Sequence, residues 1–120
     1  MRADGGKKFL EGDRMSVQFK RKESDIKKGI VQYLRSRGCL VIPYRSVGIM
    51  KKNGRYIPMH GTGVSDLLGL TKEGQFFAIE VKTDIGRPTY EQIQFLETVK
   101  SFKCIAIIAR SIDDCIKVGL

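Results

Sequence analysis

The chain has 120 residues, of which 42% are hydrophobic and 29% are charged. This length and balance are typical of one globular domain and exclude a collagen, a coiled coil or a wholly disordered chain. The sequence has no apolar run of the roughly 18 residues needed to span a bilayer, and its start has no apolar core like that of a signal peptide. We therefore expect a cytoplasmic protein without a membrane partner.

The positive charge is concentrated in one half of the chain. In total, 22 Lys and Arg residues oppose 13 Asp and Glu residues, which gives a formal net charge of +9. The segment 26–65 has no acidic residue, whereas the segment 66–120 has nearly equal numbers of acidic and basic residues. This pattern favours binding of a polyanion by one surface, and it is equally consistent with a charged surface that only keeps the protein in solution.

The first 15 residues are polar, include two adjacent glycines and show no hydrophobic period. We expect them to form a disordered extension before a single domain at 16–120. A helix is predicted at 22–37, because Ile26, Ile30 and Leu34 recur every four residues. A glycine directly after this segment is a favoured helix stop.

Two short strand patterns follow the helix. The apolar run 39–42 predicts a strand that ends at a proline. The segments 47–52 and 55–59 flank Asn53-Gly54, a favoured two-residue turn, and predict a basic hairpin. A glycine-rich loop comes next.

The second half predicts a further hairpin, a helix and a last strand. Residues 66–71 and 75–82 read as two paired strands, and 90–102 reads as a helix capped by Thr89. The apolar run 104–109 predicts a strand, after which a short helix ends the chain. This order predicts a mixed α/β fold with a central sheet covered by helices.

The last strand of this second hairpin carries two polar residues of chemical interest. Side chains alternate along a strand, so Glu80 and Lys82 share one face while the bulky apolar residues share the other. A turn centred between the last two residues of the Lys-Glu-Gly connection places Asp66 opposite Val81, within a residue of both. Two carboxylates and one ammonium are then expected to converge.

Such a cluster has a use in phosphodiester chemistry. Two carboxylates bind a hard divalent cation such as Mg²⁺ through oxygen, and the cation polarises a phosphodiester and activates water. A lysine beside it offsets developing negative charge. The alternative is an ordinary ion pair between Glu80 and Lys82 on a solvated face of the sheet, which contributes little.

Two more polar residues are predicted to face inward. Glu23 lies on the apolar stripe of the first helix, although an acidic residue at a helix N-terminus is also explained by the helix dipole. Gln92 precedes apolar residues at helical spacing, although a capping box with Thr89 explains it equally well.

The sequence around these residues resembles the VRR-NUC family, the virus-type replication-repair nucleases of the PD-(D/E)XK superfamily. The resemblance covers about residues 20–115. It rests on Gly61-x-Gly63-Val64-Ser65-Asp66-Leu67-Leu68-Gly69-Leu70, on Ala78-Ile79-Glu80-Val81-Lys82 and on Gly86-Arg87-Pro88-Thr89-x-x-Gln92-x-x-Phe95-Leu96. Ser65 stands where the superfamily name has proline.

The resemblance implies a small stand-alone nuclease domain of phage or bacterial type, with an α-β-β-β-α-β core. It implies an endonuclease dependent on Mg²⁺ or Mn²⁺ that cuts branched DNA such as four-way (Holliday) junctions, as in DNA repair. The implied metal ligands are Asp66, Glu80 and the Val81 carbonyl, with Glu23 as a further candidate. The implied catalytic residues are Glu23, Asp66, Glu80, Lys82 and Gln92.

DNA contacts are expected in three places. The basic hairpin supplies Lys51, Lys52 and Arg55, the glycine loop supplies Gly61 and Gly63, and the segment before the second helix supplies Arg87 and Thr89. Contacts of this kind position a duplex without reading its sequence. Cutting a four-way junction symmetrically needs two active sites, so a homodimer is expected. Two alternatives remain: a nicking or flap-cutting nuclease, and a non-catalytic nucleic-acid-binding module.

Overall fold

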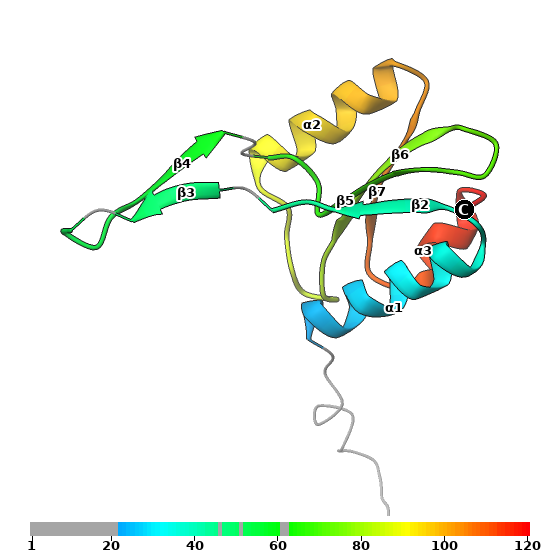
Figure 1. Cartoon of the computed structure of the whole chain (residues 1–120), viewed down its shortest axis with the longest axis horizontal. Coiled ribbons are helices and arrows are strands. Elements are labelled where there is room, and N and C mark those ends of the chain that lie inside the picture. Colours follow the sequence, from blue (N-terminus) through cyan, green and yellow to red (C-terminus); the bar gives the residue numbers. More distant parts are fainter. Residues whose placement is uncertain (1–21, 46, 51, 61–62) are drawn as a thin grey trace, which may run out of the picture.

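The computed structural model describes residues 22–45, 47–50, 52–60 and 63–120, so the extension expected at 1–15 lies outside the described residues. The sequence pattern predicts three helices and six β-strand segments, and Figure 1 shows the elements that form. In chain order they are α1 (Glu23–Ser36), β2 (Leu40–Pro43), β3 (Val47–Met50), β4 (Tyr56–His60), β5 (Leu67–Leu70), β6 (Phe76–Val81), α2 (Tyr90–Ser101), β7 (Ile105–Ala109) and α3 (Ile112–Lys117).

Four of the strands form the central sheet, in the order β2-β5-β6-β7. The pairs β2–β5 and β5–β6 are antiparallel, whereas β6 and β7 are parallel. Parallel neighbours need a crossover connection, and α2 provides it. The predicted mixed α/β fold with an α-β-β-β-α-β core is thus confirmed.

Helices cover both faces of this sheet (Figure 1). On one face, Phe77, Ile79 and Val81 of β6 pack with apolar residues of α1 and with Cys115 of α3. On the other face, Ala78 packs with apolar residues of α2. The face that carries Glu80 is therefore buried too, so the interpretation of Glu80 and Lys82 as an ion pair on a solvated face is wrong.

The predicted basic hairpin is a separate two-stranded sheet, β3–β4, that projects from the body of the domain (Figure 1). At its tip, Gly54 has a φ of 85°, and the Asn53 side-chain oxygen accepts a hydrogen bond of 3.0 Å from the backbone N–H of Arg55. Asparagine and glycine are the residues that such a turn prefers. The predicted hairpin therefore forms, but its two-residue turn is wrong: the register pairs Met50 with Tyr56, which leaves five positions between the strands.

The predicted register of the β5–β6 hairpin is wrong by one residue. The ladder pairs Leu67 with Ile79, and continuing it by one step puts Asp66 level with Glu80 rather than with Val81. The connection has three residues and ends in Gly74, whose φ of 92° is that of a left-handed turn residue. A slip of one residue moves a side chain to the other face, so this register places Asp66 and Glu80 on the same face.

The helices begin and end within about a residue of their predicted limits. α1 buries Ile26, Ile30 and Leu34, the stripe that predicted it. Among the described residues, no helix combines the length and the apolar character that crossing a bilayer requires.

Candidate active site

The candidate site lies where β5 begins and β6 ends, between α1 and the start of α2 (Figure 1). Asp66 directly precedes β5, and its Oδ2 accepts a hydrogen bond of 3.0 Å from the backbone N–H of Val81. The backbone of β6 thus orients the Asp66 carboxylate. The side chain is only partly buried, with 21% of its surface exposed.

Glu80 is the deepest charged residue of the site, with 1% of its surface exposed. Its Oε2 lies 3.3 Å from Nζ of Lys82 and accepts a hydrogen bond of 2.9 Å from Nε2 of Gln92. Its Oε1 is buried and has no hydrogen-bond partner among the described residues. A buried carboxylate oxygen without a partner is costly in an ordinary core, so this atom suits a site that binds a ligand.

The pKa of Glu80 is raised to about 7, first by burial and second by the negative charge of Asp66, while Lys82 acts in the opposite direction. Two neighbouring carboxylates resist being ionised together unless a cation neutralises them. Oxygen ligands of this type suit Mg²⁺, which takes one or two protein carboxylates and completes its shell with water and phosphate. The donor set therefore fits a hard divalent cation.

The protein supplies only part of such a coordination shell. Within the described ranges, no group of three or more His, Cys, Asp or Glu side chains converges. Asp66 and Glu80 are the two carboxylates that meet at the site. The Val81 carbonyl stays a predicted ligand, since the contact found for this residue is made by its N–H.

Gln92 fulfils both of the roles that were proposed for it. Its Oε1 accepts a hydrogen bond of 2.8 Å from the backbone N–H of Thr89, and Oγ1 of Thr89 accepts one of 3.1 Å from the N–H of Gln92. This capping box starts α2. The Gln92 amide nitrogen then remains available to hold Glu80. Thr89 itself begins the helix, which accounts for it without a phosphate contact.

Lys27 is a site residue that the sequence pattern did not reveal. Its Nζ lies 3.5 Å from Oδ1 of Asp66, although 39 positions separate the two residues. The residue lies one helical turn after Glu23, next to the buried stripe of α1. This position in the helix is the one feature of the sequence that could have predicted that Lys27 points toward the site.

Glu23 is not joined to the other site residues. It is the first residue of α1 and is half-buried. In the part of the chain that the structure describes, no hydrogen bond or ion pair connects it to Asp66 or Glu80. Its place in the first turn agrees with the helix-dipole interpretation, and its role in the site stays a prediction.

The predicted DNA-binding residues fall into three groups. Lys51 and Gly61 lie outside the described residues. Lys52, Arg55 and Arg87 are exposed and available to a ligand. Gly63 has a φ of 88°, and a Cβ there would lie 2.7 Å from the backbone oxygen of Glu91, so close packing on α2 explains this glycine.

Arg110 is a second residue that sequence reasoning missed. It follows β7, and its Nη1 donates hydrogen bonds to the carbonyl oxygens of Thr83 and Gly86, the latter over 2.8 Å. These contacts fasten the connection between β6 and α2. Lys82 directly follows β6 and Gln92 lies in the first turn of α2. By fastening the connection between these two elements, Arg110 helps to fix the positions of both residues.

Comparison with known proteins identifies the fold. No protein-family model matches the chain, and no curated protein matches it. A solved structure described as a VRR_NUC domain superposes with a TM-score of 0.57 and 22% sequence identity, over 80% of this chain and 91% of that one. The chain therefore has the fold of a VRR_NUC domain, as the resemblance of its motifs predicted.

Proposed function

We propose that this protein is a divalent-metal-dependent DNA endonuclease. The observation that carries the proposal is the buried, unpartnered Oε1 of Glu80 on a residue that meets Asp66 and Lys82 at one end of the sheet. A structural ion pair does not require an unpaired buried oxygen or a second carboxylate beside it. The likeness of the fold to a VRR_NUC domain supports the same chemistry.

In this proposal, Asp66, Glu80 and the Val81 carbonyl hold Mg²⁺ or Mn²⁺. Such an ion, when bound, polarises the phosphodiester and lowers the pKa of a coordinated water. Lys82, whose side chain is 14% exposed, stands beside Glu80, where its ammonium offsets charge on the reacting phosphate or orients the water. Gln92 fixes the Glu80 carboxylate through its amide.

We propose branched DNA, such as a four-way junction, as the substrate, and DNA repair in the cytoplasm as the setting. The projecting hairpin carries exposed basic residues on an arm, which suits a ligand recognised by shape (Figure 1). A nicking or flap-cutting nuclease uses the same site on a different DNA structure. A non-catalytic binding module is the second class, and it has no use for the unpaired Glu80 oxygen.

The test is a cleavage assay of four-way, flap, splayed and linear duplex DNA with Mg²⁺ or Mn²⁺. Asp66→Asn keeps the shape of the side chain and removes one charge. We expect cleavage to fall at least about a hundredfold, equivalent to roughly 3 kcal/mol of transition-state stabilisation. DNA binding in EDTA is expected to stay equal or become tighter, because less negative charge faces the phosphate.

The matched control is Asp113→Asn, which removes the same charge from an exposed position in α3. It is expected to cleave at the wild-type rate. Wild-type cleavage by Asp66→Asn contradicts the assignment of Asp66 as a ligand. A wild-type protein that binds all four DNA structures but cuts none with either metal favours the binding module.

A further inference from the structure

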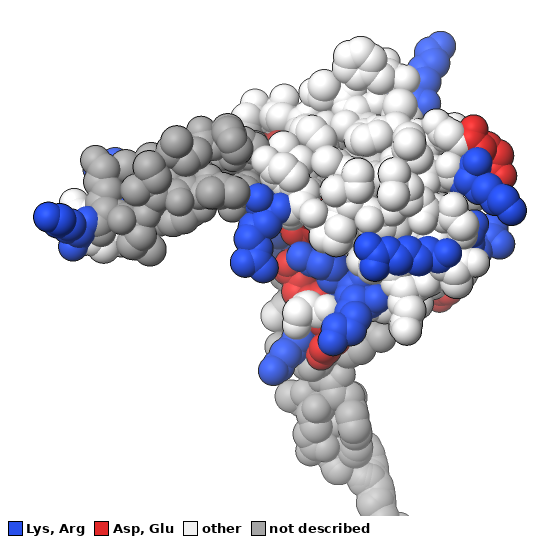
Figure 2. All heavy atoms as spheres, in the orientation of Figure 1, with Lys and Arg blue, Asp and Glu red and all other residues white. Residues whose placement is uncertain are grey.

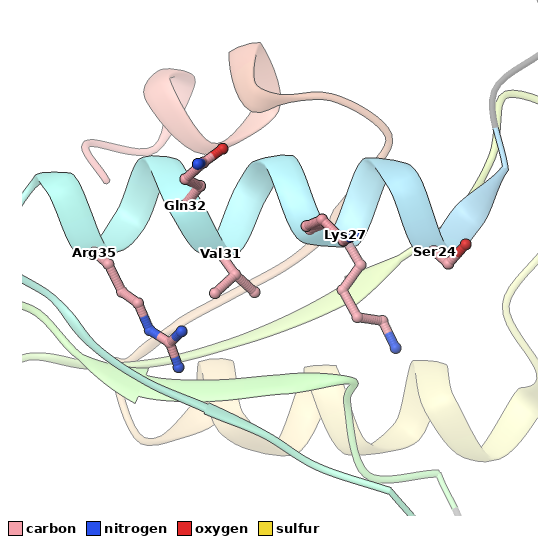
Figure 3. A pocket seen from close by; sticks show the side chains of 6 residues that line it. Ser24, Lys27, Val31, Gln32 and Arg35 are labelled. Carbon is pink, nitrogen blue, oxygen red and sulfur yellow. The ribbon is translucent and has the colours of Figure 1, made fainter.

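A shallow groove runs along the face of α1 that carries Lys27, whose ammonium contacts Asp66 of the candidate site. It encloses about 460 Å³ and is lined by Ser24, Lys27, Lys28, Val31, Gln32 and Arg35. Three of these six side chains are cationic. Figure 3 shows Lys27 and Arg35 extending from the same side of the helix toward the strands, whereas Gln32 points to the other side. Basic side chains gather over this region in Figure 2.

Each end of the groove is anchored to the sheet by one of its cations. Lys27 reaches Asp66 with a nitrogen–oxygen distance of 3.5 Å, and Arg35 donates a hydrogen bond of 3.3 Å to the carbonyl of Val41 in β2. At 1.5 Å of rise per residue, Lys27 and Arg35 are about 12 Å apart along the helix axis, the length of three to four nucleotide steps of one DNA strand. The groove therefore has a length and a positive charge that suit binding of a short stretch of nucleic-acid backbone.

The contact between Lys27 and Asp66 is the weaker of the two ion pairs at the site. Its distance is 3.5 Å with 34% of the lysine side chain exposed, compared with 3.3 Å and 14% for Lys82 at Glu80. An exposed pair of this kind gains little energy and reforms readily with other partners. Asp66 cannot offer Oδ1 to a cation of higher charge while the Lys27 ammonium occupies that side of it.

We propose that Lys27 is a displaceable counter-ion of Asp66 and that, once displaced, it holds a phosphate of the substrate strand in the groove with Lys28 and Arg35. This inference rests on the proposed function, since it takes Asp66 to be a cation ligand. Before a divalent ion binds, Lys27 neutralises Asp66. After it binds, the flexible lysine stem carries the ammonium into the groove beside the reacting phosphate. Lys27 is thus a positioning residue: it contacts the substrate strand only when a divalent ion is bound at Asp66.

The first test measures affinity for Mn²⁺ alone, by calorimetric titration without DNA. Lys27→Met keeps the stem and the helix propensity and removes the charge. We expect Mn²⁺ to bind at least about fivefold more tightly, because a competing positive charge beside the ligand has gone. Lys28→Met removes the same charge from the next position, where no contact with Asp66 exists among the described residues, and is expected to leave the Mn²⁺ affinity unchanged.

The second test measures how DNA affinity depends on salt, in EDTA and in Ca²⁺. With Ca²⁺, Lys27→Met is expected to reduce the slope of log affinity against log salt by about 0.9, the value for one lost phosphate contact on duplex DNA. In EDTA the slope is expected to equal that of the wild type, since Lys27 is then occupied by Asp66. Lys28→Met is expected to reduce the slope under both conditions.

Two results overturn the inference. Unchanged Mn²⁺ affinity in Lys27→Met removes the counter-ion role, and an equal change of slope in EDTA and Ca²⁺ makes Lys27 an ordinary surface contact. The proposed function is judged separately by Asp66→Asn in the same titration. If that variant still binds Mn²⁺ like the wild type, the metal site itself is wrong, whatever Lys27 does.

Discussion

Glu80 is the site residue whose ionisation is most unfavourable in the folded protein. It is almost fully buried, and its pKa is raised from an ordinary value of 4.5 to about 7, first by burial and then by Asp66. A carboxyl whose pKa is higher in the folded state binds its proton more tightly there. Protonation of Glu80 therefore stabilises the fold fully below pH 4.5, and this contribution is lost as the pH rises through 7. Without a bound cation, ionisation of Glu80 therefore lowers the stability of the folded protein.

We predict that Glu80→Gln reduces the loss of stability that the metal-free protein shows between pH 5 and pH 8. A rise of the pKa from 4.5 to about 7 is worth at most about 3.5 kcal/mol, since each pKa unit corresponds to about 1.4 kcal/mol. Chemical denaturation in EDTA at the two pH values measures it, with Asp113→Asn as the control for a change of one exposed charge. An identical pH dependence in Glu80→Gln and wild type contradicts the raised pKa. Mg²⁺ is expected to restore the stability of the wild type at pH 8, and not that of the variant.

Among the elements, the β3–β4 hairpin stands apart, because it forms its own two-stranded sheet outside the central one. Its tip carries the exposed Lys52 and Arg55. A two-stranded hairpin has no core of its own, so its place in the molecule is better explained by a ligand than by stability. In the proposed function, this arm contacts DNA outside the site formed by Asp66 and Glu80.

We predict that replacing Lys52 and Arg55 together by Ala lowers the slope of log affinity against log salt by about 1.8, for two lost phosphate contacts. Fluorescence anisotropy with a labelled four-way junction measures this slope. The control is Lys100→Ala with Lys117→Ala, which removes the same net charge from exposed positions in α2 and α3. An equal loss in both double variants means that only the total charge matters, and an unchanged slope removes the hairpin from the DNA surface.

The exposed basic side chains and the exposed apolar side chains lie on different parts of the molecular surface. In Figure 2 basic side chains gather around α1 and at the end of the hairpin, while a broad uncharged face lies above them. Leu40 and Ile42 of the edge strand β2 are exposed, as is Leu70, which pairs with Leu40. They share one face of the sheet, beside the part that α2 covers. An exposed apolar patch on a charged protein is typical of an interaction surface.

We predict that the protein is a homodimer in solution, because the symmetric cleavage of a junction that we propose requires two active sites on one assembly. Light scattering at micromolar concentration and physiological salt, where the Debye length is about 8 Å, measures the mass while repulsion between positive copies is screened. A protein that stays monomeric and yet makes paired symmetric cuts in a four-way junction contradicts the two-site argument.

Local patterns were sufficient to predict the elements and the identity of most site residues. The four-residue period of α1 and the capping box at Thr89 depend on neighbours in sequence, so the sequence alone determines them. The motif around Asp66 and Glu80 likewise led to the fold that the structural comparison identifies. Glu23 shows the limit of this reasoning, since a helical stripe predicts which way a residue faces and not which residue it meets.

Only the tertiary structure decided how the site is assembled. The register of β5 against β6 brings Asp66 level with Glu80, and the turn that joins the two strands includes Gly74 in a left-handed conformation. The contacts of Lys27 and Arg110 join elements that are 39 and 27 positions apart, and no local pattern encodes such distances. Glu80 is buried because α2 covers its face of the sheet. The alternation of side chains along β6 does not say whether that face meets water or a second apolar layer. The sequence by itself therefore determined which residues are capable of catalysis or ligand binding. Tertiary packing decided which of them lie together in one buried, charged site.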